Sequence, residues 1–516
     1  MKRLLTTIVA AGLAMPAFVA CGGSSSGGGG GSTLVVDDQF DLKSVDPARE
    51  FEFTGNLITH QLYETALTFK GSDVKKPVPG ICDYTMSFDN KVLTLKVTGK
   101  HTFSDGSPVT ADDIVFSYQR VQGIAGNPSF LLDGVTVKKV DDKTVTLTSK
   151  DPNPQLPFIL PNPSLGIVNS KVLQKNGGST TAKDSAEQFL NKNSQGSGPY
   201  MIDTYDVQNK VVLKANPKYA GTKPAYDRIV IQNVQASSQK VNIQGGKTQM
   251  ALSLGPDQVK GLDASKTQTI KGASTTTIYL WFNMTPAYGK AASNVKFVQA
   301  MRHAVDYNAL LKLAGDGSVQ PGGMVPVTFL GALKSDPNNS YDPAKARQLL
   351  AQSGYKGEPI SILYSNDVGF GLDDQAQAIQ AQVKKVGINL KLNPQPSATS
   401  LDAFRSGKSQ AGLAYWGADF PDPADYLVFA PGQSLAKRAA WTAAQAPTST
   451  QLATAAGQAS GDQARDAAYQ KLQQQLNVEG PWIPLFQPVD LLVAATSVKG
   501  VALNPLWTVD FGSLTK

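Results

Sequence analysis

The chain has 516 residues, of which 41% are hydrophobic and 17% are charged, so wholesale disorder and a single small domain are both excluded. The formal net charge of +7 is spread thinly, and the longest basic clusters are pairs such as Lys75-Lys76. Nucleic-acid-binding proteins usually carry a clustered basic stripe, so this class is disfavoured. The two cysteines, Cys21 and Cys82, are too few for a disulfide framework or a cysteine-based zinc site.

The first 32 residues have the pattern of a secretory leader followed by a tether. A basic start precedes an apolar run that ends at Ala20, directly before Cys21, and predicts a signal peptide over residues 1–20. A cysteine after a small residue resembles a bacterial lipobox, which implies lipidation of Cys21. A plain signal peptide with a chance cysteine is the alternative. Residues 21–32 consist of this cysteine and a Gly/Ser stretch, which is typical of a flexible tether with a reach of about 18 Å.

Alternation and capping predict the elements of the first half of the chain. Residues 92–97 alternate apolar and polar side chains, as a half-buried strand does. A threonine three residues before an aspartate predicts a capped helix over residues 111–121. Residues 135–140 and 145–147 flank an Asp-Asp-Lys turn and therefore predict a hairpin.

The second half of the chain contains a βαβ unit. Asp342 followed by Pro343 predicts the start of a helix, and Gly354 predicts its end. Beyond it, residues 360–364 and 388–392 predict two strands, and the apolar positions between these strands recur at helical spacing. The two strands are expected to pair in parallel through a right-handed crossover.

Catalytic and metal-binding patterns are nearly absent from the sequence. The three histidines, His60, His101 and His303, have no H-E-x-x-H spacing. His101 is expected at the surface, and His303 is expected to face solvent because it lies about 200° around its helix from Met301 of the core face. Cys82 is expected to be a small buried core residue. Nothing in these residues requires an enzyme, a cofactor or a bound metal.

Segments spread over residues 33–516 resemble, in order, one family of transport proteins. The most recognisable is residues 103–117, with the sequence FSDGSPVTADDIVFS. The other matching segments are 44–47, 62–67, 196–200, 216–219, 279–283, 302–306, 341–350, 416–419 and 481–485. Together they resemble the extracytoplasmic solute-binding proteins that serve ABC importers of oligopeptides, dipeptides and nickel, which form bacterial solute-binding protein family 5.

The resemblance implies an α/β fold of the periplasmic-binding-protein type, in which two lobes close over a ligand like a clam shell. An extra subdomain is expected in the first lobe, where residues 103–117 would form a turn and a capped helix. The hinge is expected near Asn283 and Pro488. The expected parts are lobe I at 33–283, its subdomain at about 70–195, lobe II at 284–488, and a return to lobe I at 489–516.

The resemblance also implies a function and a site. The protein would be a lipid-anchored receptor on the extracytoplasmic face of the cell membrane, would capture a peptide, and would deliver it to an ABC permease. In the family, the aspartate of a W-x-x-D motif pairs with the peptide ammonium, and backbone from two segments pairs with the peptide main chain. An ordinary turn role is the alternative for this aspartate. The expected ligand-binding residues are Phe51, Glu52, Phe53, Thr54, Arg405, Tyr415, Trp416, Gly417 and Asp419.

Other functions remain open at this point. The same receptor fold could take another solute, such as an oligosaccharide or a nickel complex, because no basic residue is securely matched to a peptide carboxylate. A surface hydrolase or an adhesin is a further alternative. The receptor hypothesis expects a monomer with no cofactor, no metal and no nucleic-acid partner.

Overall fold

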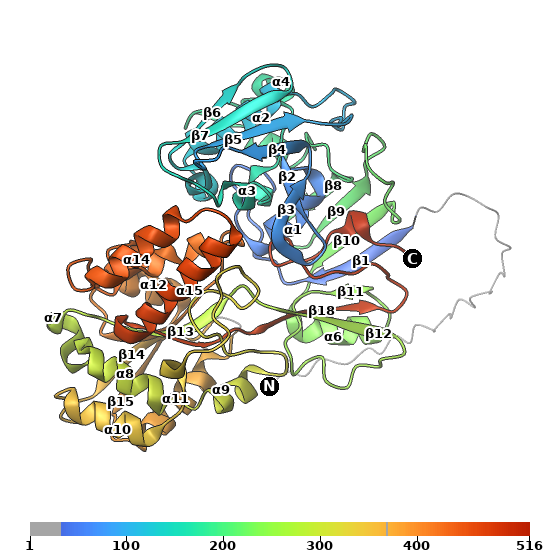
Figure 1. The fold of residues 1–516 in the computed structure, drawn as a ribbon. Coiled ribbons are helices and arrows are strands. Elements are labelled where there is room, and N and C mark those ends of the chain that lie inside the picture. The colour runs from blue at the N-terminus through green and yellow to red at the C-terminus, as the bar shows by residue number, and fades with distance from the viewer. Residues whose placement is uncertain (1–31, 368–369) are drawn as a thin grey trace, which may run out of the picture.

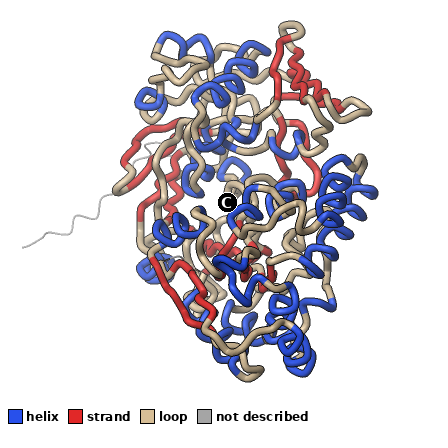
Figure 2. Tube along the Cα trace, turned by 90° about the vertical axis from the view of Figure 1, so that its left-hand side faces the viewer, coloured by secondary structure: helices blue, strands red, loops and turns tan. Residues whose placement is uncertain are grey.

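The computed structural model describes residues 32–516 except 368 and 369, and it shows a mixed α/β protein made of two bodies (Figure 1). The signal peptide, Cys21 and most of the tether lie outside the described residues. Within the described part, no helix is both long enough and apolar enough to cross a membrane. A large share of both bodies consists of loops between the elements (Figure 2).

The first lobe is built on a seven-stranded mixed sheet. Its strand β1 pairs in parallel with β10 and β11, whereas its other neighbouring strands pair antiparallel. One apolar core includes residues of helix α1 (Phe53–Leu62), and a smaller core includes a residue of helix α6 (Ala236–Gln244). In sheet order the strands are β12 (Thr267–Ala273), β18 (Val489–Ala495), β11 (Met250–Ala251), β1 (Thr33–Asp38), β10 (Arg228–Asn233), β9 (Lys210–Ala215) and β8 (Tyr200–Asp206).

A second, four-stranded antiparallel sheet and its helices form a subdomain of the first lobe. The predicted strand, hairpin and capped helix are all confirmed: helix α2 (Ala111–Ile124) begins with a capping box between Thr110 and Asp113. Cys82 is buried, as predicted. The elements are β4 (Cys82–Met86), β5 (Val92–Val97), β7 (Thr144–Ser149) and β6 (Val135–Lys139), with α3 (Leu156–Ile159), α4 (Ser170–Lys175), α5 (Glu187–Leu190) and the 3-10 helices Asn127–Leu132 and Pro163–Leu165. A separate hairpin of β2 (Leu67–Lys70) and β3 (Asp73–Pro79) precedes β4.

A buried ion-pair network ties this subdomain to the start of the chain. Arg120 of α2 lies 2.6 Å from Asp46 and 2.8 Å from Asp184, and all three side chains are almost fully buried. Burial disfavours the charged guanidinium, but the two carboxylates outweigh that effect and raise the pKa of Arg120. The network therefore gives Asp46, in the matching segment 44–47, a structural role.

The second lobe is built on a five-stranded sheet covered by helices. The predicted βαβ unit is confirmed, because β14 and β15 pair in parallel with helix α11 (Leu372–Lys384) between them. In sheet order the strands are β15 (Leu390–Gln395), β14 (Ile360–Ser365), β16 (Ala411–Trp416), β13 (Thr277–Phe282) and β17 (Trp482–Phe486). The other helices are α7 (Pro286–Gly289), α8 (Val295–Ala304), α9 (Tyr307–Ala314), α10 (Pro343–Gln352), α12 (Ser397–Arg405), α13 (Ser434–Arg438), α14 (Pro447–Gln458) and α15 (Asp462–Glu479).

The first crossing between the lobes lies earlier than the sequence prediction placed it. The prediction put the boundary after Asn283, but β13 pairs with β16 and β17 of the second lobe, so the chain crosses at residues 274–276. All six residues of β13 are buried, because alternate residues enter cores on opposite faces of the sheet. The return crossing lies at residues 487–488, directly before β18.

His303 was predicted to face solvent, and this prediction is wrong. The side chain is 2% exposed, and its Nδ1 lies 2.8 Å from the carbonyl oxygen of Ser340. Burial is the main reason that the pKa of His303 is lowered. Helix α8 packs against α10 as well as the sheet core, so the face opposite Met301 is also covered.

Candidate ligand-binding site

The predicted residues Tyr415 and Trp416 lie where the second-lobe sheet opens. Strand β13 pairs with β16 along its whole length, up to the pair Thr277 and Trp416. Strand β14 pairs with β16 only at Ala411 and Gly412. On that side, residues 413–416 have no partner strand in the described part of the chain. An unpaired strand edge presents N–H and C=O groups that can receive an added strand.

Asp419 lies just beyond this edge, and a second carboxyl group accompanies it. The backbone N–H of Asp419 donates a hydrogen bond of 3.0 Å to Oδ2 of Asp425. Burial raises the pKa of Asp419 to about 6. The pKa of Asp425 is raised well above its ordinary value, first by burial and then by the charge of Asp419. Within the described residues neither carboxylate has a Lys or Arg partner, so this pair is suited to receive a cation.

The neighbouring acid, Asp422, differs from Asp419 because its carboxylate is paired with an arginine. Asp422 caps the 3-10 helix Pro423–Phe429 by accepting the N–H of Ala424, and it lies 2.6 Å from the guanidinium of Arg465. The turn role proposed as the alternative for Asp419 is thus filled by Asp422. Among the described residues no hydrogen bond reaches the carboxylate of Asp419, which favours a ligand role for it.

The predicted segment Phe51–Thr54 lies at the start of α1, where most of its backbone donors are already used. Asp41 accepts the N–H groups of Phe53 and Thr54, and Glu52 accepts that of Phe51. Glu52 also lies 2.6 Å from Lys43. Thr54 is buried, whereas 71% of the Phe53 surface is exposed. This segment is therefore better placed to offer an exposed aromatic ring and carbonyl groups than free N–H donors.

Residues 162–164 of the subdomain connect this segment to Asp419. The hydroxyl of Ser164 donates 2.9 Å to the carbonyl of Glu50, directly before Phe51. The backbone N–H of Ser164 donates to Oδ1 of Asn162, and Nδ2 of Asn162 donates 3.1 Å to the carbonyl of Asp419. Phe51 and Phe420 also pack against the same subdomain core. The structure therefore links the two predicted segments, one from each lobe, through residues 162–164.

Arg405 does not join this group. It is exposed at the end of α12, before β16 begins, whereas Asp419 follows the end of β16. A six-residue strand spans roughly 20 Å, so the two residues lie at opposite ends of it. The neighbour that Arg405 affects is Arg438, whose pKa is lowered by burial and by this like charge.

The sequence prediction missed two residues of the site, Asp425 and Asn162. Only Asp425 could have been found from the sequence, because it is the third acid of the segment 419–425.

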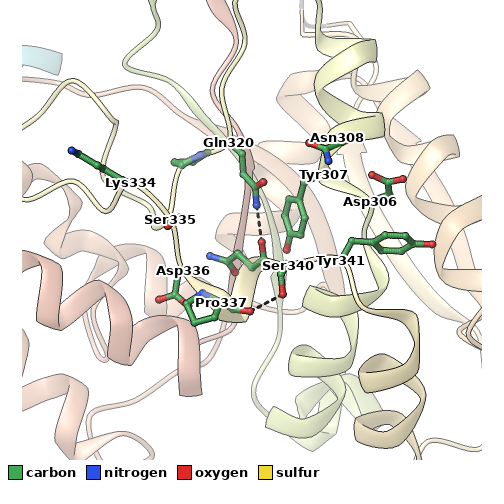
Figure 3. A pocket seen from close by; sticks show the side chains of 12 residues that line it. Asp306, Tyr307, Asn308, Gln320, Lys334, Ser335, Asp336, Pro337, Ser340 and Tyr341 are labelled. Carbon is green, nitrogen blue, oxygen red and sulfur yellow. Dashed lines mark hydrogen bonds between the residues drawn. The ribbon is translucent and has the colours of Figure 1, made fainter.

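Two cavities lie elsewhere in the protein. One, of about 720 Å³, is lined by second-lobe residues that include Tyr307, Gln320 and Lys334, and within it Gln320 donates to the carbonyl of Asn339 (Figure 3). The other, of about 290 Å³, is lined by first-lobe residues that include His60 and Asp510. No predicted ligand-binding residue lines either cavity. The candidate site is therefore defined here by a strand edge and a pair of carboxylates.

Two α/β lobes that meet at Asp419 and Phe420, just beyond an open strand edge, and that are joined by two crossings, define a two-lobe binding protein. The family model "Bacterial extracellular solute-binding proteins, family 5 Middle" matches residues 76–434. The chain belongs to this family, whose members are substrate-binding proteins and not enzymes.

Individual proteins are also similar to this chain in sequence or in structure. The chain is 27% identical over 400 residues to the probable D,D-dipeptide-binding periplasmic protein DdpA of Escherichia coli (strain K12), covering 75% of each chain. It is 24% identical over 534 residues to the periplasmic oligopeptide-binding protein OppA of Salmonella typhimurium, covering 96% of this chain and 94% of OppA. The structure of HbpA2 from Haemophilus parasuis is similar with a TM-score of 0.81 at 22% identity, over 94% of this chain and 99% of that one.

Proposed function

We propose that the protein is a lipid-anchored extracytoplasmic receptor that captures a peptide and delivers it to an ABC permease. The observation that carries the proposal is the unpaired edge of β16 at residues 413–416, which leads directly to the uncompensated carboxylates of Asp419 and Asp425. A peptide matches both features, because its main chain can extend the sheet and its terminal ammonium can neutralise the carboxylates.

Relatives with peptide-binding names support the peptide over the other solutes. DdpA and OppA are named for dipeptides and oligopeptides. An oligosaccharide would supply neither the strand nor the cation. The lipid anchor rests on Cys21 and its leader, and the permease partner rests on the family. We expect the receptor to act as a monomer.

Closure of the two lobes would couple binding to delivery. A ligand that contacts both lobes only when they are closed shifts the population to the closed form. We place the hinge at residues 274–276 and 487–488, where the N–H of Ser274 donates to the carbonyl of Pro488 and Nε2 of Gln487 donates to the carbonyl of Ser274. These short connections let the lobes rotate without disturbing either sheet.

The proposal is tested by identifying what the protein carries. Protein purified from its own host is denatured, and the released small molecules are analysed by mass spectrometry. Released peptides would support the proposal, whereas an oligosaccharide or a metal complex as the principal species would refute it. In parallel, a peptide at a hundredfold excess over Kd is expected to stabilise the protein by about 2.7 kcal/mol.

A further inference from the structure

The main chain of Asp419 is held on both sides by side chains from different parts of the molecule. Its N–H donates to Asp425, which belongs to the same lobe. Its carbonyl accepts a hydrogen bond from Asn162, which belongs to the subdomain of the other lobe. Asp425 and Asn162 are 5% and 3% exposed, so neither side chain is free to swing away into solvent. The main chain that carries the Asp419 carboxylate is thus held from both lobes at once.

The two ends of the Asn162 amide have separate roles. The oxygen caps the 3-10 helix Pro163–Leu165 by accepting the N–H of Ser164, which fixes the side chain within the first lobe. The nitrogen is thereby directed at the carbonyl of Asp419 in the second lobe. Because the donor and the acceptor belong to different lobes, this hydrogen bond is specific to the state in which the lobes meet. A buried amide nitrogen that loses its acceptor must find water or remain unpaired.

Aromatic side chains reinforce the contact on either side of this hydrogen bond. Phe420 of the second lobe is 9% exposed and packs in the core of the subdomain. In return, Phe158 of α3 packs against the second-lobe core, and its ring centre lies 5.9 Å from the guanidinium of Arg465. The subdomain with α3 lies next to the helices α14 and α15 in Figure 1. Asn162 therefore lies in a packed contact between the lobes.

We propose that Asn162 is a positioning residue for recognition of the ligand's ammonium group, because it aligns Asp419 only when the lobes are closed. The inference rests on the proposed peptide function. Asp425 holds the N–H of Asp419 in open and closed forms alike, since both residues belong to one lobe. Asn162 supplies the remaining constraint from the opposite lobe. Recognition of the ammonium and closure of the cleft then become one event.

Calorimetric titration with trialanine and N-acetyl-trialanine tests this role. Asn162→Ser keeps a capping oxygen but has no amide that reaches Asp419, and Asn162→Ala removes both. Free trialanine is expected to bind about 3- to 10-fold more weakly to either variant, the size of one neutral hydrogen bond. N-acetyl-trialanine, which has no ammonium, should bind them almost as it binds the wild type. The penalty for acetylation should therefore shrink by that same factor.

Asn169→Ala is the matched control. Asn169 is also 3% exposed and also caps a helix, through the N–H of Val172, but its Nδ2 donates to Asp105 within the subdomain. The control is expected to lose stability as Asn162→Ala does while keeping the full acetylation penalty. If the Asn162 variants weaken both peptides equally, or keep the full penalty, the positioning role is wrong. A wild type that binds trialanine with no acetylation penalty would instead overturn the proposed ammonium site as well.

Discussion

Acidification from pH 7 to pH 5 is expected to weaken peptide binding about tenfold. The ligand's ammonium favours the ionised carboxylate, and burial raises the pKa of Asp419 to about 6. The ionised fraction then falls from about 0.9 at pH 7 to about 0.1 at pH 5, and affinity falls in proportion. A peptide amine, with a pKa near 8, stays mostly protonated over this range and contributes little to the change. Affinity should therefore be present above pH 6 and lost as the pH falls through that value.

Calorimetric titrations at pH 5, 6 and 7 measure this dependence, with N-acetylated peptide as the control. Two other carboxyls, Asp38 and Asp490, also have pKa values raised to about 6 by burial, and Asp490 lies near the hinge. Any effect of these groups on closure would appear with the acetylated peptide too. We expect a flat profile for that peptide and for Asp419→Asn. Equal losses for free and acetylated peptide would show that Asp419 is not the ammonium partner.

Three further predictions concern affinity, stability and anchoring. Asp419→Asn should weaken binding of free peptide by about 2–5 kcal/mol, roughly 30- to 3000-fold by calorimetry, because the ammonium is left unpaired in the closed cleft; a change under threefold would contradict this. Arg120→Met should lower the free energy of unfolding by about 3–5 kcal/mol in urea titrations, because Asp46 and Asp184 stay buried without their partner; unchanged stability would contradict it. Cys21→Ser should move the protein from the membrane fraction to the soluble fraction, since two acyl chains make a stable anchor; an unchanged membrane fraction would exclude lipidation at Cys21.

Local elements were predictable because their determinants lie close together in the chain. The capping box of α2 involves residues three positions apart. Asp342 caps α10 by accepting the N–H groups of Ala344 and Lys345. Gly354 adopts a positive φ of 77° just beyond that helix, as its predicted end requires. The burial of His303 was not predictable in this way, because the helix that covers it starts forty residues later in the chain.

The site was predictable only in part, for the same physical reason. Asp419 stands out through its W-x-x-D motif, and the resemblance placed it beside the segment Phe51–Thr54. Asn162 contacts Asp419 across 257 positions of sequence, and no pattern around Asn162 indicates that contact. Arg405 was grouped with the site because it is close in sequence, but the strand between it and Asp419 separates them.

The raised pKa of Asp419 also explains why the site favours a cationic ligand. Burial is the cause of the shift, so the ionised carboxylate is less stable in this packed arrangement than it would be in water. The contacts made by Phe420 and Asn162 hold the segment of Asp419 in this arrangement. A bound ammonium removes the cost of burial by pairing with the carboxylate. The buried carboxylate therefore selects for a ligand that carries a positive charge, and this selection weakens as the pH falls through about 6.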